Sequence, residues 1–174
     1  MNVSAPSIPF GWARASQTGL RFRPITDADL PFLALVYAST RTEELAVTPW
    51  TDAEKAAFLD MQFRAQHQHY QAHYPEADWL VVMHGGENIG RLYIERWPSA
   101  HCIIDVALLP AHRGKGFGET LLRDLQDEAA TAGKAVSIHV EKNNRAMRLY
   151  RRLGFRTAED KGVYDLMRWT AKPD

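Results

Sequence analysis

One glycine-rich segment of the chain combines residue types suited to binding a phosphate. Arg113 and Lys115 alternate with Gly114, Gly116 and Gly118, after an apolar run and before an amphipathic stretch. Glycines let the backbone turn tightly and let a ligand come close to its amides. At the start of a helix these amides lack partners, and the helix dipole adds partial positive charge. The pattern therefore predicts a site for a phosphate or diphosphate.

Two common phosphate-binding motifs do not account for this segment. The P-loop needs a glycine, four residues and then Gly-Lys-Ser/Thr, which the segment lacks. The dinucleotide fingerprint needs a third small residue where Glu119 stands. From these residues alone, a glycine-rich turn that binds no ligand is the alternative.

Hydrophobic periodicity predicts the elements that would position this segment. Apolar runs predict strands near 20–25, 79–83, 89–97, 101–109, 135–141, 155–160 and 163–170. Apolar spacing with caps predicts helices near 27–40, 52–73, 116–132 and 143–153. This order predicts an α/β (α+β) fold, in which a mixed sheet has helices on both faces. The glycine-rich segment then lies where the central strand gives way to a helix.

Length and composition narrow the class of protein. The chain has 174 residues, 45% hydrophobic and 24% charged, which favours one globular domain over 20–172 behind a flexible lead-in at 1–19. Lys plus Arg equals Asp plus Glu, at 21 each, so the charge favours neither nucleic acid nor a membrane as a partner. Cys102 is the one cysteine, and no secretory signal or membrane span is visible. We therefore expect a cytoplasmic protein.

Two motifs together carry a family resemblance. Residues 113–118 resemble the Arg/Gln-x-x-Gly-x-Gly/Ala motif of the GNAT superfamily of N-acetyltransferases. Residues 143–155 resemble the second motif of that family, Asn-x-x-Ala-x-x-Leu-Tyr-x-x-x-Gly-Phe. The order of elements over 20–170 is similar to the family's order. The resemblance implies a mostly antiparallel sheet of about seven strands, splayed into a V between two central parallel strands.

The resemblance also implies acetyl-CoA as the co-substrate and indicates where it would bind. The amides of the glycine-rich segment would hold the coenzyme A diphosphate, and the end of the central strand would pair with the pantetheine arm. Asn143 or Asn144 would bond the pantetheine, with helix capping as the alternative for either. The implied cofactor-binding residues are Val106, Ala107, Leu108, Arg113, Gly114, Lys115, Gly116, Phe117, Gly118, Glu119, Thr120, Asn143, Asn144 and Tyr150.

Acetylation of an amine needs proton transfers, for which the chain offers several candidates. A lysine-type amine, of pKa ~10.4, must lose a proton before it attacks a thioester. The resemblance implies Tyr150 as the general acid for the departing thiolate, with a core tyrosine as the alternative. The Val106 N–H would stabilise the carbonyl oxygen. Asp105 or Glu141 acting through water, with His139 next, would be the base. A structural role is the alternative for each, and water alone could suffice.

The two helices after the first strand are expected to form the acceptor wall. Candidate acceptor-binding residues are Glu43, Glu44, Trp50, Gln62, His69 and, on the third strand, Tyr93. Glutamates there would favour a cationic amine on a small molecule or peptide. An apolar core face beside a solvated face is the alternative interpretation of the second helix. His69 and His73 are one turn apart, but no Glu between them and no nearby Cys completes a zinc motif, so no metal is expected.

The sequence is compatible with three functions. The leading hypothesis is an N-acetyltransferase in which the amine attacks acetyl-CoA directly within a ternary complex. The main alternative is a non-catalytic module that senses acyl-CoA. A nucleotide-binding regulatory domain would instead be stabilised by ATP rather than by coenzyme A. The sequence leaves open the acceptor amine, the acyl chain and the choice between monomer and homodimer.

Overall fold

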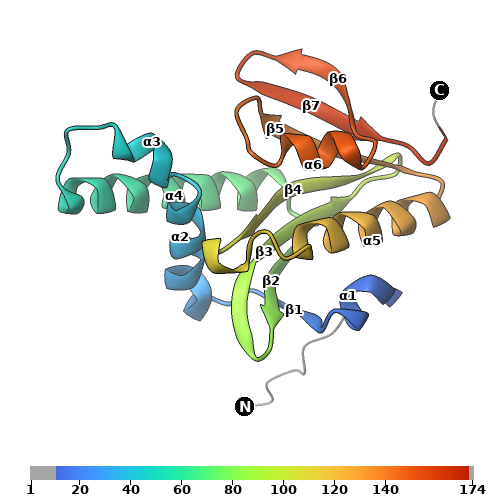
Figure 1. Ribbon diagram of the computed structural model, residues 1–174, viewed down its shortest axis with the longest axis horizontal. Helices are drawn as coiled ribbons and strands as arrows, with labels where there is room; N and C mark the ends of the chain where they lie inside the picture. Colours follow the sequence, from blue (N-terminus) through green and yellow to red (C-terminus); the bar gives the residue numbers. More distant parts are fainter. Residues whose placement is uncertain (1–10, 173–174) are drawn as a thin grey trace.

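A seven-stranded sheet forms the centre of the computed structural model, which describes residues 11–172 (Figure 1). The strands lie in the order β1-β2-β3-β4-β5-β7-β6. They are β1 (Leu20–Pro24), β2 (Asp78–His84), β3 (Glu87–Arg96), β4 (Ala100–Leu108), β5 (Ala135–Glu141), β6 (Arg156–Lys161) and β7 (Tyr164–Trp169). β4 and β5 run parallel, and the other neighbours run antiparallel. The predicted mixed, mostly antiparallel sheet is confirmed.

Helices cover both faces of this sheet. They are α1 (Ala13–Gln17), α2 (Leu30–Ser39), α3 (Thr42–Ala46), α4 (Asp52–His73), α5 (Phe117–Thr131) and α6 (Met147–Arg152), with short 3₁₀ turns η2 (Asp27–Asp29) and η3 (Pro110–His112). Side chains of α1, α5 and α6 form the main core with the strands, whereas α2 and α4 pack on each other through Leu33, Tyr37 and Phe63. Within residues 11–172, no helix has the length and apolar character needed to cross a membrane.

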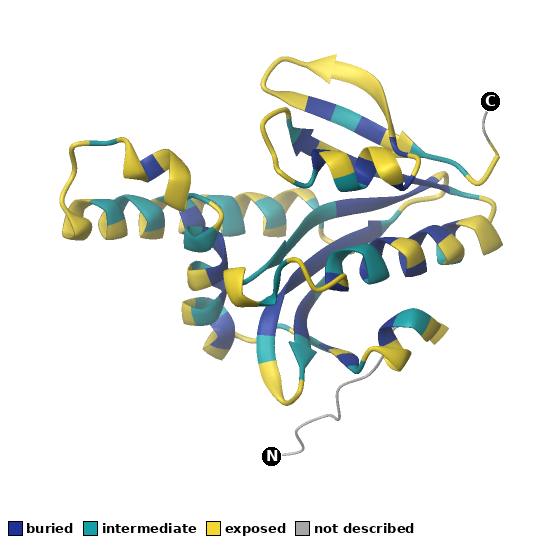
Figure 2. Ribbon diagram, in the orientation of Figure 1, coloured by how far each residue is buried: buried dark blue, intermediate teal, exposed yellow. Residues whose placement is uncertain are grey.

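Burial follows this layered arrangement (Figure 2). The central strands are largely buried, whereas β6 at the edge is exposed at all its positions. The helix predicted at 52–73 is confirmed as α4. It begins after Thr51 because the Thr51 hydroxyl accepts the Glu54 amide at 3.2 Å while the Glu54 carboxylate accepts the Thr51 amide at 2.7 Å.

Residues 12–19 are not the flexible lead-in expected from the sequence. Trp12 is 2% exposed and Ala15 is fully buried, both within the main core. The Asp124 carboxylate of α5 accepts the Ala15 amide at 2.8 Å, which fixes the start of α1. The packed part of the chain therefore begins before β1. The rest of the expected lead-in, 1–10, lies outside the described residues.

The parallel strands β4 and β5 separate along their length. Their pairing register ends at Ile103 opposite Ile138, although β4 continues to Leu108. Where β4 pairs with β3, the register shifts so that Ile104 is an extra residue. Such a bulge bends its strand and increases the local twist. The predicted splay between the two parallel strands is thus confirmed, and the bulge gives its physical cause.

Candidate active site

The glycine-rich segment forms an open turn between β4 and α5. Gly114 and Gly116 have φ angles of +71° and +85°, which other residues rarely adopt. A Cβ atom at either position would meet no protein atom within 4 Å, so the space beside the turn is open. The Thr120 amide donates to the Gly116 carbonyl at 3.0 Å, so it belongs to the helix and not to the expected cradle. Within the described chain, the amides of 114–119 have no recorded acceptor, which leaves a row of unpaired donors.

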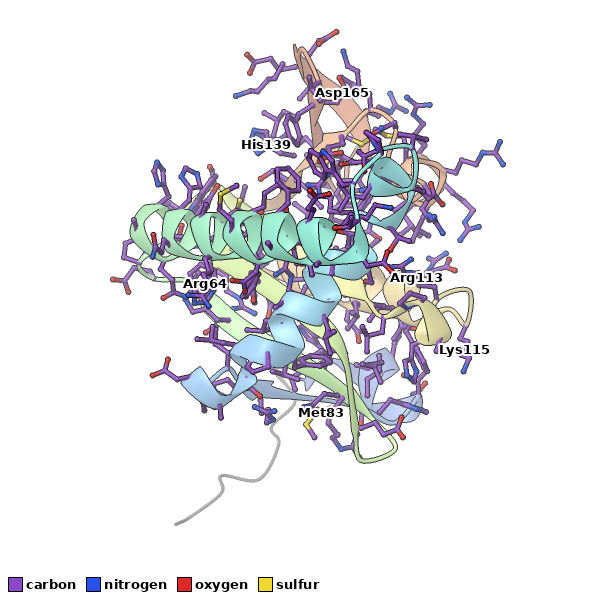
Figure 3. All side chains as sticks on the ribbon, turned by 90° about the vertical axis from the view of Figure 1, so that its left-hand side faces the viewer. Arg64, Met83, Arg113, Lys115, His139 and Asp165 are labelled. Atoms are coloured by element: carbon purple, nitrogen blue, oxygen red, sulfur yellow. The ribbon has the colours of Figure 1, made fainter. Side chains whose placement is uncertain are left out.

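Arg113 supports this turn but does not extend the row of donors, contrary to the sequence-based expectation. Its amide donates to the Pro110 carbonyl at 3.2 Å. Its side chain turns back, with Nε donating to the Leu108 carbonyl at 2.9 Å and Nη2 donating to Ser39 Oγ at 3.1 Å. Arg113 therefore ties the end of β4 to α2. Lys115 is exposed and lies at the outer edge of the molecule, where its charge is free to attract an anion (Figure 3).

The side chains at the start of α5 point away from the turn. Phe117 is 9% exposed and packs against His84 with ring centroids 4.8 Å apart, so only its backbone is offered to a ligand. Glu119 accepts from Arg123 at 3.0 Å. A Cβ at Gly118 would lie 3.8 Å from Leu149 of α6, an ordinary packing distance. The backbone of the turn, and not its side chains, is therefore the part suited to an anion.

The end of β4 presents backbone groups to the opening beside β5. The Leu109 amide donates to the Ile89 carbonyl of β3 at 2.8 Å. Because peptide groups alternate in direction along an antiparallel ladder, Ala107 also faces β3, whereas Val106 and Leu108 face the opening. No residue of β5 pairs with these two positions. An extended ligand can therefore add to this side of β4 as a further strand.

Tyr150 lies on α6 and is 4% exposed. Its ring packs edge-on against Phe155, with centroids 5.6 Å apart. Burial raises the pKa of the Tyr150 hydroxyl, and the negative charge of Asp105 raises it further. The hydroxyl is therefore protonated at neutral pH and is able to donate a proton or a hydrogen bond.

Asp105 is ion-paired with Arg91 of β3, whose side chain is 3% exposed. Arg91 Nη2 also donates to Gln66 Oε1 of α4 at 3.0 Å. Burial disfavours the charge on Arg91, but Asp105 and its neighbours raise the pKa of Arg91 overall. The sequence left open whether Asp105 is a catalytic base or a structural residue. In the structure it forms an ion pair, which is the structural alternative. Tyr93 is 1% exposed and packs 4.9 Å from Trp79, so it is part of the interior and not of an open acceptor border as expected.

Replacing Asp105 with asparagine is expected to lower the free energy of unfolding by about 2 kcal/mol. Removing one partner of a fully buried ion pair costs ~3–5 kcal/mol, and Asp105 is partly exposed, so the cost should be lower. Urea denaturation measures the change. Asp60→Asn is the control, because Asp60 pairs with Arg64 on the surface, and its loss should cost less than ~1 kcal/mol. Equal losses in the two variants would contradict a buried role for Asp105.

Glu141 and His139 share one side of β5, as their spacing predicts, but their surroundings differ. Glu141 Oε1 accepts from Arg41 Nη1 at 3.0 Å. The His139 side chain is largely exposed, and its partial burial, followed by the nearby charge of Lys161, lowers its pKa (Figure 3). Arg41 therefore joins Glu141 to the end of α2, whereas His139 has no such link to the acceptor wall among the described residues. Of the two candidate bases, only Glu141 is held by a residue of the expected acceptor wall.

The two adjacent asparagines before α6 have different roles in the structure. Asn144 Oδ1 accepts the Ala146 amide at 2.8 Å, and the Asn144 amide donates to the Glu141 carbonyl at 2.9 Å. This local turn delays the start of α6 to Met147, so the helix predicted at 143–153 is shorter than expected. The Asn143 side chain is exposed and has no such local bond within the described residues. Asn143 is therefore the asparagine whose amide group is available to a ligand.

The expected acceptor residues do not gather in one pocket. The carboxylate of Glu43 pairs with Arg145, and that of Glu44 accepts from Arg41 at 2.9 Å. Both glutamates are therefore paired with arginines in this structure, and Arg41 is shared between Glu44 and Glu141. Apart from the buried Tyr93 of β3, the others lie along α4 or just before it: Trp50 packs on Phe58 with centroids 4.9 Å apart, Gln62 accepts from the Tyr37 hydroxyl at 2.9 Å, and His69 is exposed.

Two hollows of the surface lie away from these residues. The larger, of about 530 Å³, is lined by residues of α1 and α5 together with Arg96 and His101. The other, of about 450 Å³, is lined by parts of β6 and β7. No group of three or more His, Cys, Asp or Glu side chains that could hold a metal occurs among residues 11–172.

Three arginines near the opening were not singled out from the sequence. Arg41 pairs with Glu44 and Glu141, Arg91 with Asp105, and Arg145 with Glu43. One signal for Arg91 existed: a charged residue within a predicted strand, which antiparallel pairing would bring close to the charged Asp105. Arg41–Glu44 is a local pair three residues apart, whereas Arg41–Glu141 and Arg145–Glu43 join segments far apart in the sequence, for which the sequence offers no local signal.

Comparison with known proteins identifies the family. The description "Acetyltransferase (GNAT) family" belongs to the family model that matches residues 40–155. Mycothiol acetyltransferase of Corynebacterium glutamicum is 34% identical over 95 residues, which cover 53% of this chain and 32% of that protein. The chain thus spans about a third of the length of the curated relatives it matches.

Solved structures extend the likeness to the fold. PaiA N-acetyltransferase from Thermoplasma acidophilum, in complex with coenzyme A, superposes with a TM-score of 0.64 at 16% identity, over 87% of this chain and 98% of that one. PH1933 from Pyrococcus horikoshii gives a TM-score of 0.64 at 20% identity, over 88% of this chain and 99% of that one. The glycine-rich turn, the splayed parallel strands and α6 all lie within or beside the matched residues. The chain belongs to the GNAT family of acetyltransferases.

Proposed function

We propose that the chain is an N-acetyltransferase that transfers an acetyl group from acetyl-CoA to an amine. The observation that carries the proposal is a row of unpaired amides at 114–119, directly beside a strand end that β5 leaves unpaired. A diphosphate and an extended amide-containing arm are the two parts of coenzyme A that such backbone groups suit. The family membership and the coenzyme A complex of a structural neighbour support the same co-substrate.

The donor groups of the site fit coenzyme A. The amides of 114–119 would hold its diphosphate, since no protein atom lies within 4 Å of a Cβ built at Gly114 or Gly116. The peptide groups of Val106 and Leu108 would pair with the pantetheine arm. Asn143 would bond the same arm, because its neighbour Asn144 is engaged in a local turn. The side chain of Arg113 holds the turn in place instead of binding the ligand.

The chain's own residues supply the proton and the hydrogen bonds that transfer needs. Coenzyme A provides the acetyl thioester; the amine nitrogen bonds to the carbonyl carbon, and the carbon–sulfur bond breaks. The Val106 N–H, which faces the opening, donates to the carbonyl oxygen as negative charge develops there. Tyr150 donates its hydroxyl proton to the departing sulfur, which the raised pKa of the phenol permits at neutral pH.

The amine must also lose a proton, for which Asp105, Glu141 and His139 were the candidate bases. Asp105 and Glu141 are each ion-paired with an arginine, so neither is an unpaired carboxylate that could act as a general base. We assign deprotonation to water in the opening, with these carboxylates orienting that water. His139 is left out because its side chain is exposed and, among the described residues, no ion pair joins it to the acceptor wall.

The proposal is tested by release of free thiol from acetyl-CoA against a panel of amines. Turnover that depends on one class of amine is the expected result. Tight binding of acetyl-CoA without turnover on any amine would favour the alternative of an acyl-CoA sensor. Thermal stabilisation by ATP but not by coenzyme A would contradict both, because a specific ligand raises the melting temperature by mass action.

A further inference from the structure

Two ion pairs connect the segment after α2 with the end of β5 and the turn that follows it. Arg41 Nη1 lies 3.0 Å from Glu141 Oε1, and Glu43 pairs with Arg145. In the first pair the arginine comes from the segment after α2, and in the second pair it comes from the turn after β5. Each side therefore contributes one arginine and one glutamate. In Figure 1, α2 and α3 lie with the β1–β4 part of the sheet, whereas α6 lies with β5–β7. The two pairs therefore link the halves that separate where β4 leaves β5.

The two pairs differ in how readily they can break. The side chains of Arg41 and Glu141 are each 22% exposed, and Arg41 also binds Glu44. The side chains of Glu43 and Arg145 are 83% and 66% exposed. Exposed pairs contribute little net free energy because water and salt screen them. We call Glu43–Arg145 the outer pair and Arg41–Glu141 the inner pair. The exposed outer pair can exchange one partner for a stronger one, whereas Arg41 of the inner pair is held by Glu44 as well as by Glu141.

The outer pair is connected to the start of the glycine-rich turn through the end of α2. Arg113 Nη2 donates to Ser39 Oγ at 3.1 Å, and Glu43, the partner of Arg145, follows Ser39 by four residues. The two charges also act on Arg113: after burial, Arg145 lowers the pKa of Arg113 and Glu43 raises it. Arg145 also follows Asn143 by two residues, on the turn that the proposed function assigns to the pantetheine. An anion held by the amides of 114–119 would thus be near a guanidinium whose present partner is a weakly held carboxylate.

We propose that Arg145 binds a phosphate group of coenzyme A and that Glu43 is its internal competitor in the ligand-free protein. This inference rests on the proposed function. The phosphates of coenzyme A together carry more negative charge than one exposed carboxylate, and each can accept charge-assisted hydrogen bonds from a guanidinium. Binding of the cofactor then releases Glu43, while Arg41 keeps its bond to Glu141.

The test is the affinity of the full chain for coenzyme A, measured by titration calorimetry. Glu43→Gln is expected to strengthen binding roughly three-fold, since it removes a competitor of modest strength. Arg145→Gln is expected to weaken binding roughly ten-fold or more, because a charge-assisted contact is lost. In the double variant, Glu43→Gln should give no gain, because Glu43 acts only through Arg145. Glu44→Gln is the matched control: it removes the same charge one residue away, and its affinity should stay within about two-fold of the original.

Two shorter ligands distinguish the phosphates. Dephospho-coenzyme A lacks the 3′-phosphate, and pantetheine lacks every phosphate. A Glu43→Gln gain that persists with dephospho-coenzyme A assigns Arg145 to the diphosphate, and a gain that disappears assigns it to the 3′-phosphate. A gain with pantetheine, an equal gain for Glu44→Gln, or an undiminished gain in the Arg145→Gln background would overturn the inference. Absence of coenzyme A binding by the unmodified chain would overturn the proposed function as well, so the two failures are distinguishable.

Discussion

Gly116→Val is expected to weaken binding of coenzyme A by roughly 100-fold or more while leaving a folded protein. Gly116 has a φ of +85° and precedes the first residue of α5. A β-branched residue disfavours this backbone conformation, and its side chain would occupy the open space beside the amides. Loss of two or more charge-assisted hydrogen bonds to a diphosphate accounts for the size of the effect. Titration calorimetry with coenzyme A provides the measurement.

Gly133→Val is the matched control for this change. Gly133 follows the other end of the same helix, with a φ of +68° and no atom within 4 Å of a Cβ built there. Both substitutions impose a similar backbone strain of ~1–2 kcal/mol, so both should lower the melting temperature by a similar amount. Only Gly116→Val should lose affinity for the cofactor. Retained affinity in Gly116→Val, or equal losses in both variants, would remove the glycine-rich turn from the cofactor site.

Tyr150→Phe is expected to lower turnover by roughly ten- to a thousand-fold, within the range for general acid catalysis. The change removes one hydroxyl and keeps the ring that packs against Phe155. The Tyr150 hydroxyl makes no recorded hydrogen bond within residues 11–172, so little stability should be lost. Steady-state kinetics with acetyl-CoA and the best amine of the panel separates the effects. The loss should appear in kcat, with the KM for acetyl-CoA changed little, because the proton is needed only when the thiolate departs.

The protonation state of Tyr150 gives this prediction a second measurement. Burial, and then the charge of Asp105, raises the pKa of the hydroxyl above its ordinary value of ~10. The group is protonated below that pKa, so its deprotonation should cause no loss of kcat up to about pH 9. Tyr74→Phe, at the end of α4, is the control, and its turnover should match that of the unmodified chain. Full activity of Tyr150→Phe would exclude the hydroxyl from the reaction.

Much of the fold was predictable because its signals are local. The helix at 52–73 is set by its cap at Thr51, and β5 was predicted over 135–141 with the bounds it has in the structure. The turn after β4 was also predictable, since positive φ angles at Gly114 and Gly116 follow from glycine's own freedom. The short helix α1 was missed because its apolar residues are few. They become buried only when they meet α5, which lies far along the chain.

What only the tertiary structure decided is which groups meet across the opening. The splay depends on a bulge at Ile104, which is set by how two strands align and not by the identity of one residue. The partner of Asp105 is Arg91 of β3 and that of Glu141 is Arg41 between α2 and α3, so two candidate bases became members of ion pairs. Sequence alone determined the elements and the glycine-rich turn, because propensity, capping and backbone freedom act over a few residues. It left the charges unpaired, because an electrostatic partner is chosen by distance in space, which only folding defines.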